Sequence, residues 1–161
     1  MSILIKYLII LGISMVPVIE LRGAVPTGII GMDLNPVLVY FLSVFGNMAP
    51  VPVILLFVRR VFDWMKKKSE RLGNIARKFE EKAESKKGKV QKFEFWGLLV
   101  FVAIPAPGTG AWTGALIAAM LDMRLKRAIP AILLGVVTAG IIMTVGSVFF
   151  ADLFAGLVKA L

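Results

Sequence analysis

Two ionisable residues, Glu20 and Arg22, lie inside the first apolar stretch of the chain. A charged side chain at membrane depth is costly unless it is paired or hydrated, so such residues are functional candidates by default. A glutamate there can carry a proton or attract a cation, and an arginine can hold a phosphate or carboxylate through its fork of donors. Residues two apart do not share a helix face, so the pair is expected in a non-helical turn, facing a shared cavity. The alternative, that both residues tie this turn to the rest of the protein or lie in water at an interface, stays open.

A second segment, from Pro105 to Gly110, carries no charge but interrupts another apolar stretch. Its backbone amides and carbonyls and the hydroxyl of Thr109 are candidate ligand-binding groups. A helix that begins near Thr109 to Trp112 directs the positive end of its dipole towards the break, so an anion is expected there. Trp112 can stack on a cation or a ring or pack in the core, and Thr113 adds a hydroxyl.

Asn47, in the middle of a further apolar stretch, is another candidate. An amide at this depth needs a partner and can hydrogen-bond a broken segment, so a structural role and a role in a site are equally compatible with its position. The candidate substrate- or ion-binding residues are Glu20, Arg22, Asn47, Thr109, Trp112 and Thr113.

The composition indicates that these residues belong to an integral membrane protein. Of the 161 residues, 58% are hydrophobic, against roughly 45–50% in globular proteins. The apolar residues gather into four stretches, 3–32, 36–58, 95–121 and 128–150, long enough to enter or cross a bilayer. The chain has no Cys and no His, which excludes disulfides, thiol nucleophiles and the usual zinc sites. No catalytic residue, metal or cofactor is expected, and the protein is not expected to be an enzyme.

The first and third stretches are expected to be re-entrant hairpins, and the second and fourth to be spanning helices. Proline removes a backbone donor and glycine weakens helix formation. Non-helical backbone at membrane depth survives only where protein or water covers it. Both stretches are therefore expected to enter the membrane, break and return. The residues expected to break them are Pro17, Gly23, Pro26, Gly28, Pro105, Pro107, Gly108 and Gly110.

The basic residues predict the orientation. Thirteen of the nineteen Lys and Arg lie in the segment 59–94, and an excess of Lys and Arg marks a cytoplasmic loop. That segment, expected to be helical, and the basic loop 122–127 therefore belong on the cytoplasmic side. The turn at 33–35 has no Lys or Arg and belongs outside, together with both termini. The net charge of +9 then indicates anionic lipid rather than nucleic acid as the neighbour.

This orientation divides the chain into two halves that face opposite sides of the membrane. The expected parts are a first repeat over 1–58, a cytoplasmic linker over 59–94, and a second repeat with a short tail over 95–161. Asp33 and Asp122 are 89 residues apart, as are Gly46 and Gly135. The predicted fold class is an all-α integral membrane protein with two inverted repeats, each a re-entrant helical hairpin plus a transmembrane helix. Such repeats are typical of secondary transporters.

Two segments resemble the signatures of a known family. They are ELRGAVPTG at 20–28 with Gly46-Asn47-Met48 downstream, and PAPGTGAWTG at 105–114 with the later Gly135. Both are similar to the small multidrug export protein family, a group of short bacterial and archaeal membrane proteins, and the resemblance covers nearly the whole chain outside the basic linker. That family is similar to the wider DedA/VTT superfamily, which implies two inverted re-entrant hairpins and, for some members, polyprenyl-phosphate transport or lipid scrambling. The DedA pattern has arginines in its second hairpin, where this chain has no charge.

The residues and the resemblance together predict a transporter or flippase of an amphipathic substrate, coupled to protons or another cation through Glu20. The alternatives are an uncoupled lipid scramblase, a polyprenyl-phosphate carrier and a membrane scaffold subunit. The expected location is the inner or plasma membrane of a prokaryote, with several passes. The expected partners are membrane lipid and an amphipathic small molecule or lipid, without nucleic acid. The small residues Gly135 and Gly140 also suggest a homodimer interface.

Overall fold

The computed structural model describes residues 2–68, 87–106 and 108–160, and this part of the chain is helical. Two of its helical segments are long and apolar enough to cross a membrane, Pro36–Val58 and Leu125–Leu153. In an apolar stretch of 18 residues within each segment, only 28% and 39% is buried inside the protein. The core helix of a soluble protein would be mostly buried, so this outward-facing apolar surface calls for a lipid environment or a partner.

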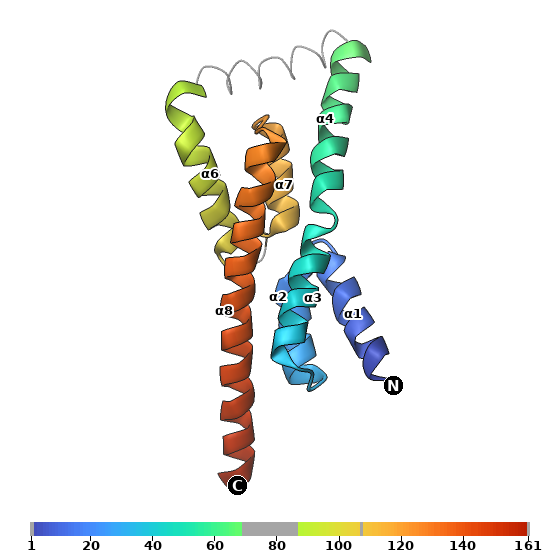
Figure 1. The fold of residues 1–161 in the computed structure, drawn as a ribbon, viewed down its shortest axis with the longest axis vertical. Helices are drawn as coiled ribbons and strands as arrows, with labels where there is room; N and C mark the ends of the chain where they lie inside the picture. The colour runs from blue at the N-terminus through green and yellow to red at the C-terminus, as the bar shows by residue number, and fades with distance from the viewer. Residues whose placement is uncertain (1, 69–86, 107, 161) are drawn as a thin grey trace.

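The first apolar stretch folds into a helical hairpin. Helices α1 (Ile3–Met15) and α2 (Glu20–Pro26) run in opposite directions, and the chain turns between them over residues 16–19 (Figure 1). Pro17 lies in this turn, as the sequence predicts. Val18 has a φ of 75°, a left-handed conformation that is rare for a β-branched residue.

The returning arm of this hairpin accommodates Pro26 by widening the helix. Pro26 has no N–H to donate to the preceding turn, and its ring presses on that turn. The chain continues into η1 (Thr27–Gly31), a π-helical turn, which is a common form of local helix irregularity. Gly23, Pro26 and Gly28 therefore lie in the returning arm, and not at the hairpin tip where they were expected.

Helices α3 (Pro36–Met48) and α4 (Val51–Lys68) follow each other with a bend at residues 49–50. Asn35 caps α3, because its side-chain oxygen accepts hydrogen bonds from the two backbone N–H groups of Val37 and Leu38 at 3.0 and 3.2 Å. Pro50 and Pro52 supply no backbone N–H. The spanning segment expected over 36–58 therefore has the predicted bounds, but it is bent into two helices (Figure 1).

The third apolar stretch also folds into a helical hairpin. Helices α6 (Lys87–Ala103) and α7 (Ala111–Met120) are joined by a turn that contains Pro105 and Gly108, and Gly108 has a φ of 84°. Pro107 lies outside the described residues. Of the expected linker, residues 59–68 belong to α4, residues 87–94 belong to α6, and residues 69–86 are outside the described part of the chain.

The two hairpins approach each other from opposite ends of the molecule. Figure 1 shows α1 and α2 in the lower half and α6 and α7 in the upper half, with both turns near mid-height. The long helix α8 (Leu125–Ala160) runs beside both hairpins. The core lies where these elements meet and is rich in small residues, among them Ala24, Ala111, Ala115 and Ala131.

Corresponding positions in the two halves make corresponding contacts. A Cβ added at Gly46 in α3 would lie 2.8 Å from the carbonyl oxygen of Leu11 in α1, and one added at Gly135 in α8 would lie 2.9 Å from that of Leu99 in α6. Each glycine thus lets a long helix pack closely on the first arm of its own hairpin. Asp33 and Asp122 also share left-handed backbones, with φ of 52° and 51°.

The proposed dimer contacts at Gly135 and Gly140 need correction, because both glycines are buried inside the protein. A Cβ at Gly140 would lie 2.8 Å from the ring of Tyr40 in α3. Gly135 packs α8 on α6, and Gly140 packs α8 on α3. Small residues serve helix packing here as expected, but within one chain.

Candidate functional site

Glu20 lies at the tip of the first hairpin and is almost completely buried, with 2% of its surface exposed. It is the first residue of α2, and its φ of 51° departs from helical geometry. Its Oε2 accepts a hydrogen bond from Nη1 of Arg22 at 2.7 Å. The two side chains form an ion pair although they are only two residues apart, because the left-handed backbone of Glu20 redirects the start of the helix.

The Glu20 carboxylate also binds the beginning of α7 in the second hairpin. The backbone N–H of Ala111 donates to Oε2 at 3.2 Å, and the backbone N–H of Trp112 donates to Oε1 at 3.1 Å. The first N–H groups of a helix have no partner within the helix, and they favour negative charge. The anion expected at this helix start is therefore the carboxylate of the protein's own Glu20.

Gly110 makes this contact possible. It occupies the N-cap position of α7 and makes no side-chain cap. A Cβ at this position would overlap the carboxylate group of Glu20. Glycine at 110 thus serves to admit a side chain from the other half of the molecule, whereas the sequence suggested only a helix-breaking role.

Arg22 binds the end of α6 as Glu20 binds the start of α7. Its Nη2 donates to the carbonyl oxygens of Val102 and Ile104 at 3.3 and 2.9 Å. The last carbonyls of a helix lack partners within it and favour positive charge. The ion pair therefore spans the break between α6 and α7, with each charge at the helix end that complements it.

Thr109 completes the contact inside the second turn. Its Oγ1 accepts from Nη2 of Arg22 at 3.0 Å and lies 2.7 and 2.8 Å from the carbonyl oxygens of Ile104 and Ala106. The hydroxyl has one proton, so it donates to one of these two carbonyls at a time. We call Glu20, Arg22, Thr109 and the first two N–H groups of α7 the central node.

Trp112 makes a reciprocal contact from the second hairpin to the first. Its indole Nε1 donates to the carbonyl oxygen of Met15, the last residue of α1, at 3.2 Å. Arg22 makes the equivalent contact in the other direction, to Ile104, which is 89 positions after Met15. Trp112 also packs against the core, and its stacking on a cation or a ring stays a prediction.

Asn47 and Thr113 are not joined to the central node by any hydrogen bond among the described residues. Thr113 is half-buried on α7. Asn47 is fully enclosed, with 0% of its surface exposed, and neither its Oδ1 nor its Nδ2 has a hydrogen-bond partner. Ser43, which is not among the residues predicted from the sequence, is also 0% exposed with an unpartnered Oγ. Its spacing of four residues from Asn47 was the available signal, because such residues share a helix face.

Comparison with known proteins identifies the family. A family model described as "Putative small multi-drug export protein" matches residues 20–142. The chain belongs to this family. The match begins at Glu20 and contains every residue of the central node, together with Ser43 and Asn47. No curated protein and no solved structure gives a significant match. The resemblance seen in the two motifs is therefore confirmed at the level of the small multidrug export family, while the relation to the DedA/VTT superfamily stays a prediction.

Proposed function

We propose that the protein is an ion-coupled membrane transporter of an amphipathic substrate, and that the central node is its gate. The observation that carries the proposal is that the buried carboxylate of Glu20, from one half, is held by backbone N–H groups of the other half at 3.1 and 3.2 Å. The family description, which names drug export, supports transport.

In this proposal the two hairpins are re-entrant and the two halves are inverted repeats. The equivalent glycine contacts at Gly46 and Gly135, and the equivalent backbones at Asp33 and Asp122, support it. Two helix breaks that meet near mid-height also support it (Figure 1). Secondary transporters commonly place broken helices at the midplane and rock one repeat against the other. A relation to the DedA/VTT superfamily would imply the same architecture.

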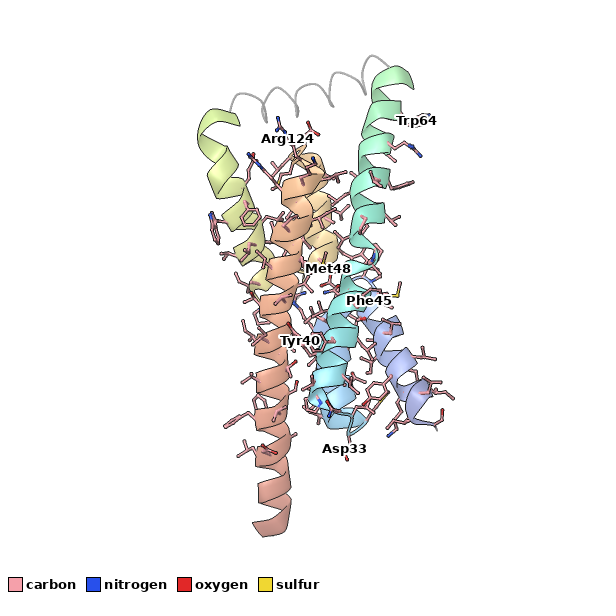
Figure 2. All side chains as sticks on the ribbon, viewed as in Figure 1. Asp33, Tyr40, Phe45, Met48, Trp64 and Arg124 are labelled. Atoms are coloured by element: carbon pink, nitrogen blue, oxygen red, sulfur yellow. The ribbon has the colours of Figure 1, made fainter. Side chains whose placement is uncertain are left out.

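The basic end of the molecule is proposed to be cytoplasmic, in the inner or plasma membrane of a prokaryote. Arg124, directly before α8, and Lys126 and Arg127 in its first turn are exposed, and Arg60 is exposed on α4. Figure 2 shows Arg124 at the end of the molecule where α4 ends and α6 begins, and Asp33 at the opposite end of the hairpin region. Lys and Arg favour the cytoplasmic side, so the turn containing Asp33 faces outside.

The proposed coupling follows from the contacts of Glu20. In the observed state its carboxylate has three donors, one from Arg22 and two from α7. Separation of the halves removes the two backbone donors, and a buried carboxylate that loses donors is strongly disfavoured. A proton or a metal cation compensates for that loss. Ion uptake and opening of the node are therefore thermodynamically linked, because the ion binds the open state better than the closed one.

The substrate is proposed to be amphipathic because the described helices expose apolar side chains to their surroundings and carry their buried charges only at the node. The pair formed by Glu20 and Arg22 has no net charge, so both a lipophilic cation and a lipid phosphate are suitable first probes. The proposal includes no catalytic step, cofactor or nucleic-acid partner.

The test is uptake into proteoliposomes with and without H⁺ and Na⁺ gradients, with a fluorescent lipophilic cation and a labelled polyprenyl phosphate as probes. One gradient should accelerate uptake of one probe by wild type but not by Glu20→Gln. Asp33→Asn is the matched control, because Asp33 is exposed and Asn tolerates its left-handed backbone. Equilibration of the lipid probe at a rate that depends on neither the gradient nor the Glu20→Gln substitution would identify a scramblase. Transport of neither probe would favour a scaffold.

A further inference from the structure

Ser43 and Asn47 form a buried polar pair that the central node does not use. Both residues are 0% exposed, and Oγ of Ser43 and Oδ1 and Nδ2 of Asn47 have no hydrogen-bond partner. They are one helical turn apart on the same face of α3. Most buried polar side-chain atoms have a partner, and each one left without costs about 1–3 kcal/mol. Two such residues side by side indicate a site for a small polar ligand.

Helical geometry places this pair on the side of α3 that faces α2. On α3, Gly46 faces α1, while Tyr40 and Val44 face Gly140 of α8. At about 100° per residue, Ser43 and Asn47 point between these two directions. Helix α2 packs on both α3 and α8 in that interval.

The packing of η1 on α3 sets the level of the pair along the helix. A Cβ at Gly28 would lie 2.8 Å from Cγ1 of Val39, so these two residues are at the same height. The two segments run in opposite directions (Figure 1). Asn47 is eight residues after Val39, and Glu20 is eight residues before Gly28. Because the segments are antiparallel, Asn47 and Glu20 are both displaced by about 12 Å in the same direction from the level of Val39 and Gly28. Asn47 therefore lies at the level of Glu20 and of the hairpin turn.

We infer that Ser43 and Asn47 bind a monovalent metal cation, Na⁺, at a site separate from Glu20. Hydroxyl and amide oxygens are neutral, hard ligands that suit such a cation. Secondary transporters commonly bind Na⁺ beside broken helices near the membrane midplane, and the first hairpin turn lies at this level. Complete enclosure of both side chains excludes an organic substrate. The inference goes beyond the proposed function, because it adds a cation site that the central node does not contain.

The test measures Na⁺ binding directly, without transport. Thermal unfolding of the detergent-purified protein is followed in increasing NaCl, with KCl or choline chloride keeping the ionic strength constant, and binding of radioactive Na⁺ is measured in parallel. Wild type should show a saturable rise in unfolding temperature that is specific for Na⁺. Asn47→Leu and Ser43→Ala should weaken Na⁺ binding by at least about tenfold.

Two features keep the test informative. Asn47→Leu replaces an unpartnered amide by an apolar group of similar size, so without Na⁺ this variant should unfold at or above the wild-type temperature. Thr144→Val is the matched control, because Thr144 also has a buried, unpartnered hydroxyl. It lies on the side of the Gly140 contact away from Asn47, and this variant should keep the full Na⁺ response.

The results separate this inference from the proposed function. Equal effects of Na⁺ and K⁺ on wild type, or an unchanged Na⁺ response in Asn47→Leu, would overturn the Na⁺ site. Transport driven by a proton gradient would in that case leave the proposed function standing. Specific Na⁺ binding that Asn47→Leu abolishes would establish the site even if no substrate moved in the uptake assay, and that failure would count against the transporter alone.

Discussion

At the scale of single residues, the ion pair of Glu20 and Arg22 acts as a connector between the halves. A buried ion pair adds little net stability, because the cost of removing both charges from water offsets their attraction. Loss of one partner is much more harmful, since it leaves the other charge buried alone. The value of this pair lies in its additional contacts, which satisfy the end of α6 and the start of α7 simultaneously.

Gly110→Ala tests whether the node needs the space beside Glu20. The added methyl group overlaps the Glu20 carboxylate, so the carboxylate must leave α7 and the pair loses its partners. We expect a loss of about 3 kcal/mol in the free energy of unfolding, measured by denaturant titration in detergent. Gly12→Ala is the control, because nothing lies within 4 Å of a Cβ at that position in α1. Similar effects of the two substitutions would contradict the packing described for the node.

Arg22→Lys tests the geometry of the node while keeping its charge. One guanidinium bonds Glu20 through Nη1, and Ile104 and Thr109 through Nη2. An ammonium is a compact point charge without this fork, so it cannot hold all three partners in the same positions. Gradient-driven uptake should fall by at least about tenfold, as expected for about 1.4 kcal/mol of lost interaction. Lys6→Arg, which changes a basic residue near the N-terminus, should leave uptake unchanged.

At the scale of elements, the sequence predicts the positions of the helix breaks better than it predicts which residues contact them. Pro17 and the segment from Pro105 to Gly110 are found in turns because proline and glycine act on the local backbone. Pro26 and Gly28 carry the same local signal but lie inside a helical arm, because a π-helical turn absorbs the irregularity. The partner of each break comes from the other hairpin, roughly 90 residues away, and no local pattern encodes that contact.

Gly135→Ala tests the packing of α8 on α6. A Cβ at Gly135 would approach Val102 to 2.7 Å and the carbonyl oxygen of Leu99 to 2.9 Å, and overpacking of this kind costs about 1–3 kcal/mol. The unfolding free energy should fall by that amount, while the mass of the detergent-solubilised particle stays the same because the glycine is buried within the chain. Gly146→Ala, with nothing within 4 Å of its Cβ, should have little effect. A lower particle mass in Gly135→Ala would instead restore Gly135 as a dimer contact.

At the scale of the whole molecule, the two halves are similar in backbone but different at the node. Glu20 begins the returning arm of the first hairpin, and Gly110 directly precedes that of the second. Acidic side chains at both positions would compete for one space and repel each other. One half therefore supplies both charges, and the other supplies only backbone groups, Thr109 and Trp112. This asymmetry explains why the sequence of the second turn has no charged residue.

Single-cysteine labelling tests the proposed arrangement of the two halves across the membrane. The chain has no Cys, so Ser2→Cys, Asp33→Cys, Arg60→Cys and Arg124→Cys each introduce one thiol at an exposed position. In intact cells, a membrane-impermeant maleimide should label positions 2 and 33 only, and inverted vesicles should give the opposite result. If α6 and α7 together formed one complete membrane crossing instead of a re-entrant hairpin, positions 60 and 124 would be labelled from opposite sides. An odd number of crossings places two positions on opposite faces of the membrane. Labelling of positions 60 and 124 from the cytoplasmic side alone would therefore show that the second hairpin leaves the membrane on the side where it entered.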